Sequence, residues 1–139
     1  MKYNQGRLID HVAIHVADLE VSRRFYRAIF GALEKLDGFE DHRDFFCCDE
    51  LYVGASSKPT GSLHLAFQAD SIDAVHAFHA AGLAAGGTDN GGPGYRHYHP
   101  AYYAAFLLDP DGNNVEALCD VGATRNAESI VITRPIDGT

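Results

Sequence analysis

The sequence lacks several features that would place it in a special class of protein. It has no tryptophan, one methionine and three cysteines. Cys47 and Cys48 are adjacent, Cys119 stands alone, and no Cys-x-x-Cys spacing occurs. This pattern predicts free thiols rather than a disulfide framework or a cysteine zinc site.

Basic residues are scarce, with 11 lysines and arginines against 19 aspartates and glutamates, a formal net charge of −8. Such a surface repels phosphate backbones and anionic lipids, so we expect neither nucleic acid nor membrane as a partner. No apolar run approaches the roughly 20 residues of a membrane span. The first ten residues lack the apolar core of a secretory signal, which favours a cytoplasmic location.

The composition that is present suits one globular domain. Of the 139 residues, 46% are hydrophobic and 22% are charged, close to the average for globular proteins. A chain of this length can bury a stable hydrophobic core without disulfides or bound metals to cross-link it. We therefore expect a single domain over residues 1–139.

An internal repeat is the most informative feature of the sequence. Residues 11–16 (HVAIHV) and 64–69 (HLAFQA) share the pattern histidine, apolar, alanine, apolar, polar, small, at an offset of 53 residues. The similarity continues as far as Phe25 and Phe78. A repeat of this length predicts a duplicated supersecondary unit.

Each copy begins with the signals of a strand followed by a helix. In the first copy, residues 8–16 alternate as a half-buried strand, and Asp18 is placed to cap a helix that ends near Phe30 at Gly31. In the second copy, residues 62–68 predict a strand. Asp70 or Ser71 would cap a helix that reaches Ala81 and ends at Gly82.

Short extended segments follow each helix. Residues 55–61 are rich in serine, proline and glycine and form the predicted boundary between the copies. Residues 109–112 (DPDG) predict a tight turn between two strands, and residues 86–100 predict a loop because they hold five glycines and two prolines. The predicted strands are residues 32–36, 43–48, 51–54, 83–85, 102–108 and 114–119, with 130–132 as a possible edge strand.

The order of elements predicts an α+β fold. Two βαβββ modules, at about residues 7–55 and 61–119, would form a cupped, mostly antiparallel sheet with the helices outside, followed by a C-terminal tail at 120–139.

Three polar residues stand out on strands whose neighbours are apolar. His11 and His64 occupy matching positions in the two copies, and Glu116 lies between Val115 and Ala117 on the last strand. Side chains alternate across a strand, so each of the three can point to the concave face. Two imidazoles and one carboxylate would form a divalent metal site with open positions. The competing interpretation is that these are ordinary strand residues.

The same residues carry a family resemblance. Residues 11–19 (HVAIHVADL), with Phe25, Tyr26 and Gly31, and residues 103–116 (YAAFLLDPDGNNVE) resemble the opening and the closing hairpin of the vicinal oxygen chelate superfamily. This superfamily includes glyoxalase I, fosfomycin-resistance transferases, bleomycin-resistance proteins and extradiol dioxygenases. The resemblance covers residues 8–118.

The resemblance implies that His11, His64 and Glu116 bind one divalent ion (Fe, Zn, Mn, Ni or Co) and that a small substrate chelates it through vicinal oxygens. It also implies a homodimer, with the site either inside one chain or shared between two. Glyoxalase-type isomerases carry a further glutamate near the position of Tyr52, which disfavours a true glyoxalase I. The leading expectation is a lyase/isomerase-like or dioxygenase-like metal enzyme. The alternative is a metal-free, ligand-sequestering protein of the bleomycin-resistance type.

Four further residues are candidates for contact with a substrate. One of Tyr102 and Tyr103 should face the concave side, and the resemblance favours Tyr103 as a hydrogen-bond donor or acid. Arg96 and His97 end the glycine-rich segment, where Arg96 could pair with a substrate carboxylate. Tyr52 is the fourth candidate. An ordinary packing role for the tyrosines and a solvated loop for residues 96–97 are the alternatives.

Overall fold

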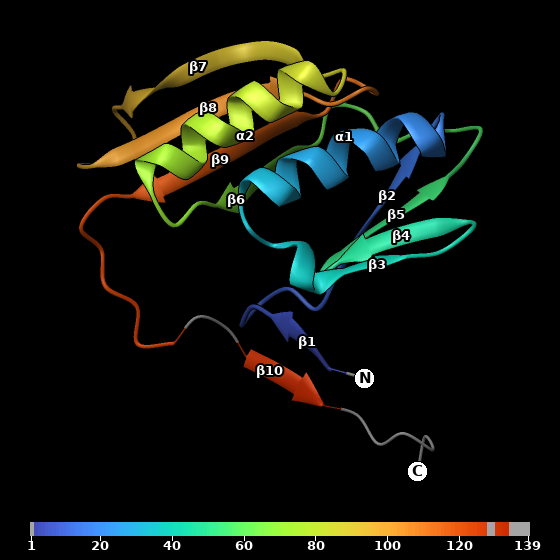
Figure 1. The fold of residues 1–139 in the computed structure, drawn as a ribbon, viewed down its shortest axis with the longest axis horizontal. Coiled ribbons are helices and arrows are strands. Elements are labelled where there is room, and N and C mark those ends of the chain that lie inside the picture. Colours follow the sequence, from blue (N-terminus) through green and yellow to red (C-terminus); the bar gives the residue numbers. More distant parts are fainter. Residues whose placement is uncertain (1, 128–129, 134–139) are drawn as a thin grey trace.

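The computed structural model describes residues 2–127 and 130–133. Two four-stranded mixed sheets and two α-helices form an α+β fold, as the sequence predicts. Each sheet is associated with one helix, and the two helices lie side by side (Figure 1).

The first module is a βαβββ unit. In its sheet the strand order is β2-β5-β4-β3, and β2 runs parallel to β5 while the other pairs are antiparallel. Its elements are β2 (Val12–Val16), α1 (Leu19–Ala32), the 3₁₀ turn η1 (Leu36–Gly38), β3 (Phe39–Asp41), β4 (Phe45–Cys48) and β5 (Leu51–Ala55).

The second module repeats this topology. Its strand order is β6-β9-β8-β7, and β6 runs parallel to β9. Its elements are β6 (His64–Gln68), α2 (Ile72–Ala84), β7 (Thr88–Arg96), β8 (Tyr102–Leu108) and β9 (Asn114–Asp120). The paired βαβββ arrangement predicted from the repeat is therefore confirmed.

The predicted helix starts are correct and the predicted glycine stops are wrong. Asp18 accepts hydrogen bonds from the backbone N–H groups of Glu20 and Val21, and the Ser71 side chain accepts from Ala74 N–H, as N-caps do. Gly31 and Gly82, however, lie inside α1 and α2. Each helix continues past its glycine because the tertiary packing of the helix outweighs a local propensity of about 1 kcal/mol.

Most of the segment 86–100, which the sequence predicts to be a loop, is a strand. Residues 88–96 form β7, antiparallel to β8, with register shifts between Asp89 and Gly91 and between Gly91 and Gly94. Gly91 has a positive φ of 141°, and bulges at glycines let an irregular sequence pair as a strand. The predicted strands at 32–36 and 83–85 are also wrong, because helical residues and the turns after them occupy those positions, and β3 was not anticipated.

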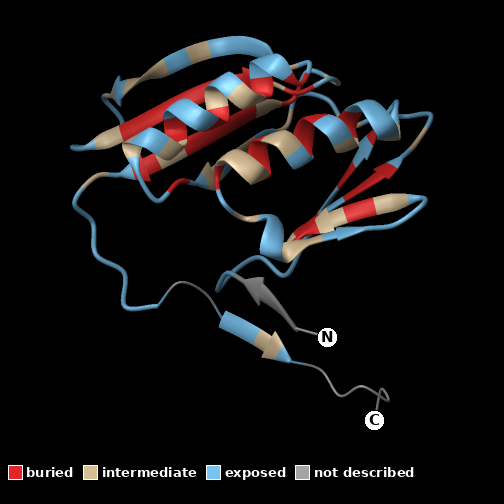
Figure 2. Cartoon of the chain, viewed as in Figure 1, coloured by how far each residue is buried: buried red, intermediate tan, exposed pale blue. Residues whose placement is uncertain are grey.

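The core lies between the helices and one face of each sheet (Figure 2). Phe25, Tyr26 and Ile29 from α1 and Phe78 from α2 are fully buried. The Tyr26 hydroxyl donates a 2.6 Å hydrogen bond to Asp109 in the β8–β9 turn, which joins the two modules. Burial and the Asp109 carboxylate raise the pKa of Tyr26 well above its ordinary value. The opposite face of each sheet carries the polar candidates.

The chain ends pair with each other, apart from the two modules (Figure 1). β1 (Lys2–Gln5) and β10 (Ile130–Thr133) form a two-stranded antiparallel sheet. Residues 130–132 therefore do form an edge strand. Within the described ranges, neither helix is long and apolar enough to cross a membrane.

Candidate metal and substrate site

The second module brings two of the three predicted metal ligands into contact. β6 and β9 are parallel neighbours, with Ala66 opposite Glu116 in the register. His64 Nε2 lies 2.9 Å from Glu116 Oε1. The Glu116 side chain is only 3% exposed, whereas the His64 side chain is 49% exposed. The pair therefore presents a buried carboxylate beneath an accessible imidazole.

Two neighbouring side chains orient this pair. The Tyr102 hydroxyl donates a hydrogen bond to Glu116 Oε2, and the Asn114 amide nitrogen lies 2.6 Å from His64 Nδ1. If Asn114 donates to Nδ1, the neutral His64 ring carries its proton on Nε2 and donates it to Glu116. Nε2 and Oε1 then share this proton. A cation would bind to these two atoms in place of the proton.

Burial and the bond to Glu116 raise the pKa of Tyr102. A tyrosine hydroxyl is already protonated around neutral pH, and the raised pKa keeps Tyr102 a donor to Glu116 at alkaline pH as well.

The donor chemistry fits a divalent ion. An imidazole nitrogen and a carboxylate oxygen are common ligands of Fe, Zn, Mn, Ni and Co. Burying a carboxylate is costly unless a cation or hydrogen bonds compensate. In the part of the chain that the structure describes, no lysine or arginine forms an ion pair with Glu116, and its compensation comes from the contacts with His64 and Tyr102.

His11 does not complete the site within one chain. It precedes β2 by one residue, its side chain is 68% exposed, and its Nδ1 lies 2.8 Å from Asp10 Oδ1. Among residues 2–127 and 130–133, no three His, Cys, Asp or Glu side chains are close enough to hold a metal ion together. The predicted strand over 8–16 begins only at Val12, so its alternation does not extend to His11.

The structure reverses the expected orientations of the two tyrosines. Phe106 lies opposite Glu116 in the β8–β9 register, and Tyr102 lies four pairs further along, an even number, so it shares the face of Glu116. Tyr103 points to the other face, where its hydroxyl lies 2.6 Å from His76 Nε2 on α2. The expectation that Tyr103 faces the concave side is wrong. Strict alternation from Glu116 would have identified Tyr102 if the hairpin register had been known.

The remaining candidates occupy different places. Arg96 ends β7 opposite Tyr102 and therefore lies on the Glu116 face of the second sheet. His97 is exposed in the turn after β7. Tyr52 lies in the first module opposite Ala13, as Glu116 lies opposite Ala66 in the second. Tyr52 thus occupies the module-one position of Glu116, and its ring stacks on Phe45 at 5.0 Å.

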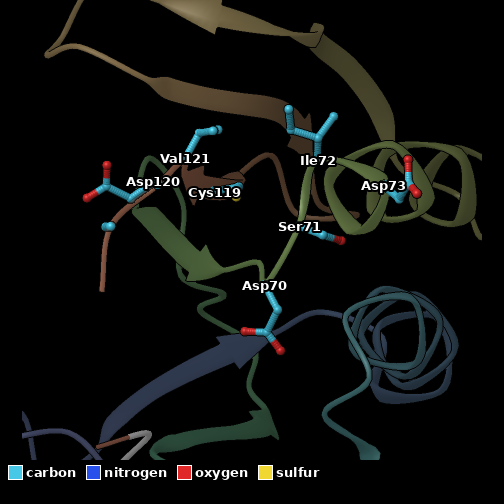
Figure 3. A pocket seen from close by; sticks show the side chains of 9 residues that line it. Asp70, Ser71, Ile72, Asp73, Cys119, Asp120 and Val121 are labelled. Atoms are coloured by element: carbon cyan, nitrogen blue, oxygen red, sulfur yellow. The ribbon is translucent and has the colours of Figure 1, made fainter. Parts of the chain in front are cut away.

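Two pockets on the surface lie away from this pair. The pocket in Figure 3 lies at the start of α2 and the end of β9, where Asp70, Asp73 and Asp120 contribute carboxylates. A larger cavity of about 600 Å³ lies between the modules. Neither is lined by His64 or Glu116. His64 and Glu116 instead lie on the uncovered face of a sheet, and a second surface has to cover them to enclose a substrate.

Comparison with known proteins identifies the family. Residues 8–117 match the model of the Glyoxalase/Bleomycin resistance protein/Dioxygenase superfamily, so the chain belongs to this superfamily. No curated protein matches the chain.

Solved structures agree with this assignment. A glyoxalase/bleomycin resistance protein from Albidiferax ferrireducens T118 is 35% identical and has a TM-score of 0.66, covering 81% of this chain and 99% of its own. A lactoylglutathione lyase from Agrobacterium tumefaciens (22% identity, TM-score 0.58, 83% and 95% covered) has a similar fold. So does the oxidase ChaP-H1 (22%, 0.60, 82% and 96%). At this identity, the last two show a shared fold alone.

Proposed function

We propose that the protein is a metal-dependent enzyme of the glyoxalase/dioxygenase type that acts on a small substrate held through vicinal oxygens. The observation that carries the proposal is the contact between His64 Nε2 and the buried Glu116 carboxylate on an open sheet face. One divalent ion would bind to these two side chains and would polarise the substrate oxygens. Tyr102 would hold the second carboxylate oxygen of Glu116 in place.

We propose that His11 of a second copy of the chain supplies the third ligand. His11 is exposed, and the uncovered faces of the two sheets carry the matching positions of the repeat, so a two-fold dimer can place the module-one face of one copy over the module-two face of the other. Tyr52 and His97 would then become substrate contacts. The homodimer, the small-molecule substrate and a cytoplasmic location belong to the same proposal.

The reaction is restricted by the residue at the module-one position equivalent to Glu116. Because Tyr52 occupies the equivalent position in the first module, that position has no second carboxylate to take a proton from carbon. A three-ligand site leaves positions open for a chelating substrate. This supports chemistry of the lyase/isomerase-like or dioxygenase-like kind over a true glyoxalase I.

Metal binding by the full chain tests the proposal. Protein prepared without chelators or a histidine tag would be titrated with Zn²⁺, Ni²⁺ and Fe²⁺, with metal content checked by elemental analysis. We expect one ion per chain, and at least about tenfold weaker binding in His64→Ala and Glu116→Gln. His79→Ala is the matched control, because His79 lies on α2 beside Asp89. A folded protein that takes up none of these ions would refute the proposal.

Subunit mixing tests the shared site. His11→Ala and Glu116→Gln would each lose metal binding alone. When the two variants are unfolded together and refolded, random pairing of subunits should restore about a quarter of the sites. Recovery of no sites from a properly refolded mixture would show that His11 does not complete the site of a partner.

One observation favours the alternative function. The Glu116 carboxylate already has hydrogen-bond partners in His64 and Tyr102, and hydrogen bonds can offset the cost of its burial without a cation. This arrangement suits a metal-free ligand-sequestering protein of the bleomycin-resistance type. That protein would bind an aromatic or drug-like ligand equally well with His64→Ala and without added metal, and the ligand would raise its melting temperature.

A further inference from the structure

The Arg96 guanidinium packs against glycines of β7, on the sheet face that carries the proposed site. Its guanidinium Nη2 donates a 2.6 Å hydrogen bond to the Gly92 carbonyl. A Cβ on Gly94 would come within 3.1 Å of Nη1, and one on Gly91 within 3.3 Å of Nη2. The glycines that made residues 86–100 look like a loop therefore leave space for this side chain.

The charge of Arg96 has no carboxylate partner among the described residues. Arg23 and Arg27, by contrast, both pair with Asp41. Arg24 likewise forms no ion pair among the described residues, but it is exposed on α1, whereas Arg96 is half-buried on a sheet face. The two carbonyls that it contacts, those of Gly92 and Tyr95, leave other N–H groups of the fork for a ligand.

The position of Phe106 links Arg96 to the proposed metal ligands. The Arg96 guanidinium carbon lies 5.3 Å from the centroid of the Phe106 ring. The His64 ring lies 6.2 Å from the same centroid. Arg96 and His64 thus flank one aromatic ring, and a single small molecule can reach from one to the other.

We infer that Arg96 forms an anion subsite and that the substrate carries a carboxylate in addition to the oxygens held at His64 and Glu116. The part of this inference that concerns the oxygens held at His64 and Glu116 rests on the proposed function. The anion subsite at Arg96 itself does not require a metal. An arginine fork binds a carboxylate through two parallel hydrogen bonds, and it discriminates against a neutral group of the same shape.

The first experiment uses the metal-free protein. Benzoate and its neutral isostere benzamide are titrated by NMR chemical-shift mapping into wild type, Arg96→Gln, Arg96→Lys and Arg24→Gln. Arg24→Gln is the matched control because it removes one positive charge from the exposed side of α1. We expect wild type and Arg24→Gln to bind benzoate at least about tenfold more tightly than benzamide. Arg96→Gln should lose this preference, and Arg96→Lys should keep part of it.

A purely structural role for Arg96 predicts a different result. It would lower the melting temperature of Arg96→Gln and would leave benzoate and benzamide indistinguishable in wild type. Equal binding of the two probes by wild type, or an unchanged benzoate preference in Arg96→Gln, would overturn the inference. Arg96→Lys keeps the test available if Arg96→Gln folds poorly.

The second experiment tests the anion subsite at Arg96 together with the proposed metal site at His64 and Glu116. Zn²⁺-loaded protein is titrated by calorimetry with catechol, 3,4-dihydroxybenzoate and 3,4-dihydroxybenzamide. Wild type should prefer the benzoate at least about tenfold, and Arg96→Gln should bind all three alike. If Zn²⁺ does not bind while the metal-free benzoate preference stands, the proposed function fails and the anion subsite survives. If Zn²⁺ and catechol bind without a carboxylate preference, the subsite fails and the metal site survives.

Discussion

Two glycines inside helices should respond in opposite directions to the same substitution. Gly82 in α2 and Gly31 in α1 both lie within helical backbone. Replacing an interior helical glycine with alanine ordinarily stabilises a protein by about 0.5–1 kcal/mol. A Cβ on Gly31 would come no closer than 3.4 Å, to Leu36 Cδ1, which is ordinary contact. Gly31→Ala should therefore gain that amount.

At Gly82 the same methyl group has no room. Its Cβ would lie 2.2 Å from Leu107 Cδ1 on β8 and 3.1 Å from Ile29 Cγ2 on α1. Leu107 and Ile29 are both fully buried, so neither can swing into solvent. Overpacking of this kind costs about 1–3 kcal/mol. Because the 2.2 Å overlap with Leu107 is severe, we expect the upper part of that cost, about 2–3 kcal/mol. After the helical gain of about 0.5–1 kcal/mol is subtracted, Gly82→Ala should be destabilised by roughly 1–2.5 kcal/mol.

Urea unfolding and calorimetry at one fixed protein concentration would measure both variants. The melting temperature of Gly82→Ala should fall by roughly 3–8 °C, while that of Gly31→Ala should rise by about 2–4 °C. If Gly82→Ala were as stable as wild type, the close approach of the two helices to β8 would be wrong. A destabilised Gly31→Ala would refute the use of helical propensity as the baseline.

Two further predictions concern single side chains. Tyr102→Phe removes the donor to Glu116 Oε2 and should weaken Zn²⁺ binding by about 10–100-fold. Tyr103→Phe removes a hydrogen bond on the opposite face of the sheet and should leave Zn²⁺ binding unchanged. Equal Zn²⁺ affinities of the two variants in a competition assay would contradict the assigned orientations. Burial raises the pKa of the Cys48 thiol from 9.0 to about 12. Its contribution to stability is therefore present below pH 9 and is lost as the pH rises from 9 to 12, by at most about 1.4 kcal/mol per pH unit. Urea unfolding should show a steeper alkaline decline in wild type than in Cys48→Ala, and identical slopes would disprove the shift.

Much of the fold could be predicted from local signals. The repeat predicted two βαβββ modules, and Asp18 and Ser71 begin their helices as capping residues do. The strand at residues 102–108 was placed correctly, as was the DPDG turn after it. These features depend on interactions between residues close in the sequence, so the amino-acid sequence alone is enough to predict them.

Other features were invisible because they depend on contacts between distant segments. Residues 88–96 pair as a strand only because β8 offers a free edge and glycines permit the bulges. Gly82 remains helical because Leu107 and Ile29 pack against it. In both cases the local preference was real, and a partner from another part of the chain outweighed it.

The candidate site divides in the same way. The sequence by itself determined which residue types could bind a metal. The parallel pairing of β6 with β9, a contact between distant segments, brought His64 and Glu116 together. Only the tertiary structure decided that Tyr102 rather than Tyr103 faces Glu116, that Arg96 lies beside Phe106, and that His11 stands apart. The reason is that one residue of register moves a side chain to the opposite face of a sheet. Register is set by hydrogen bonds between strands, which no single segment encodes.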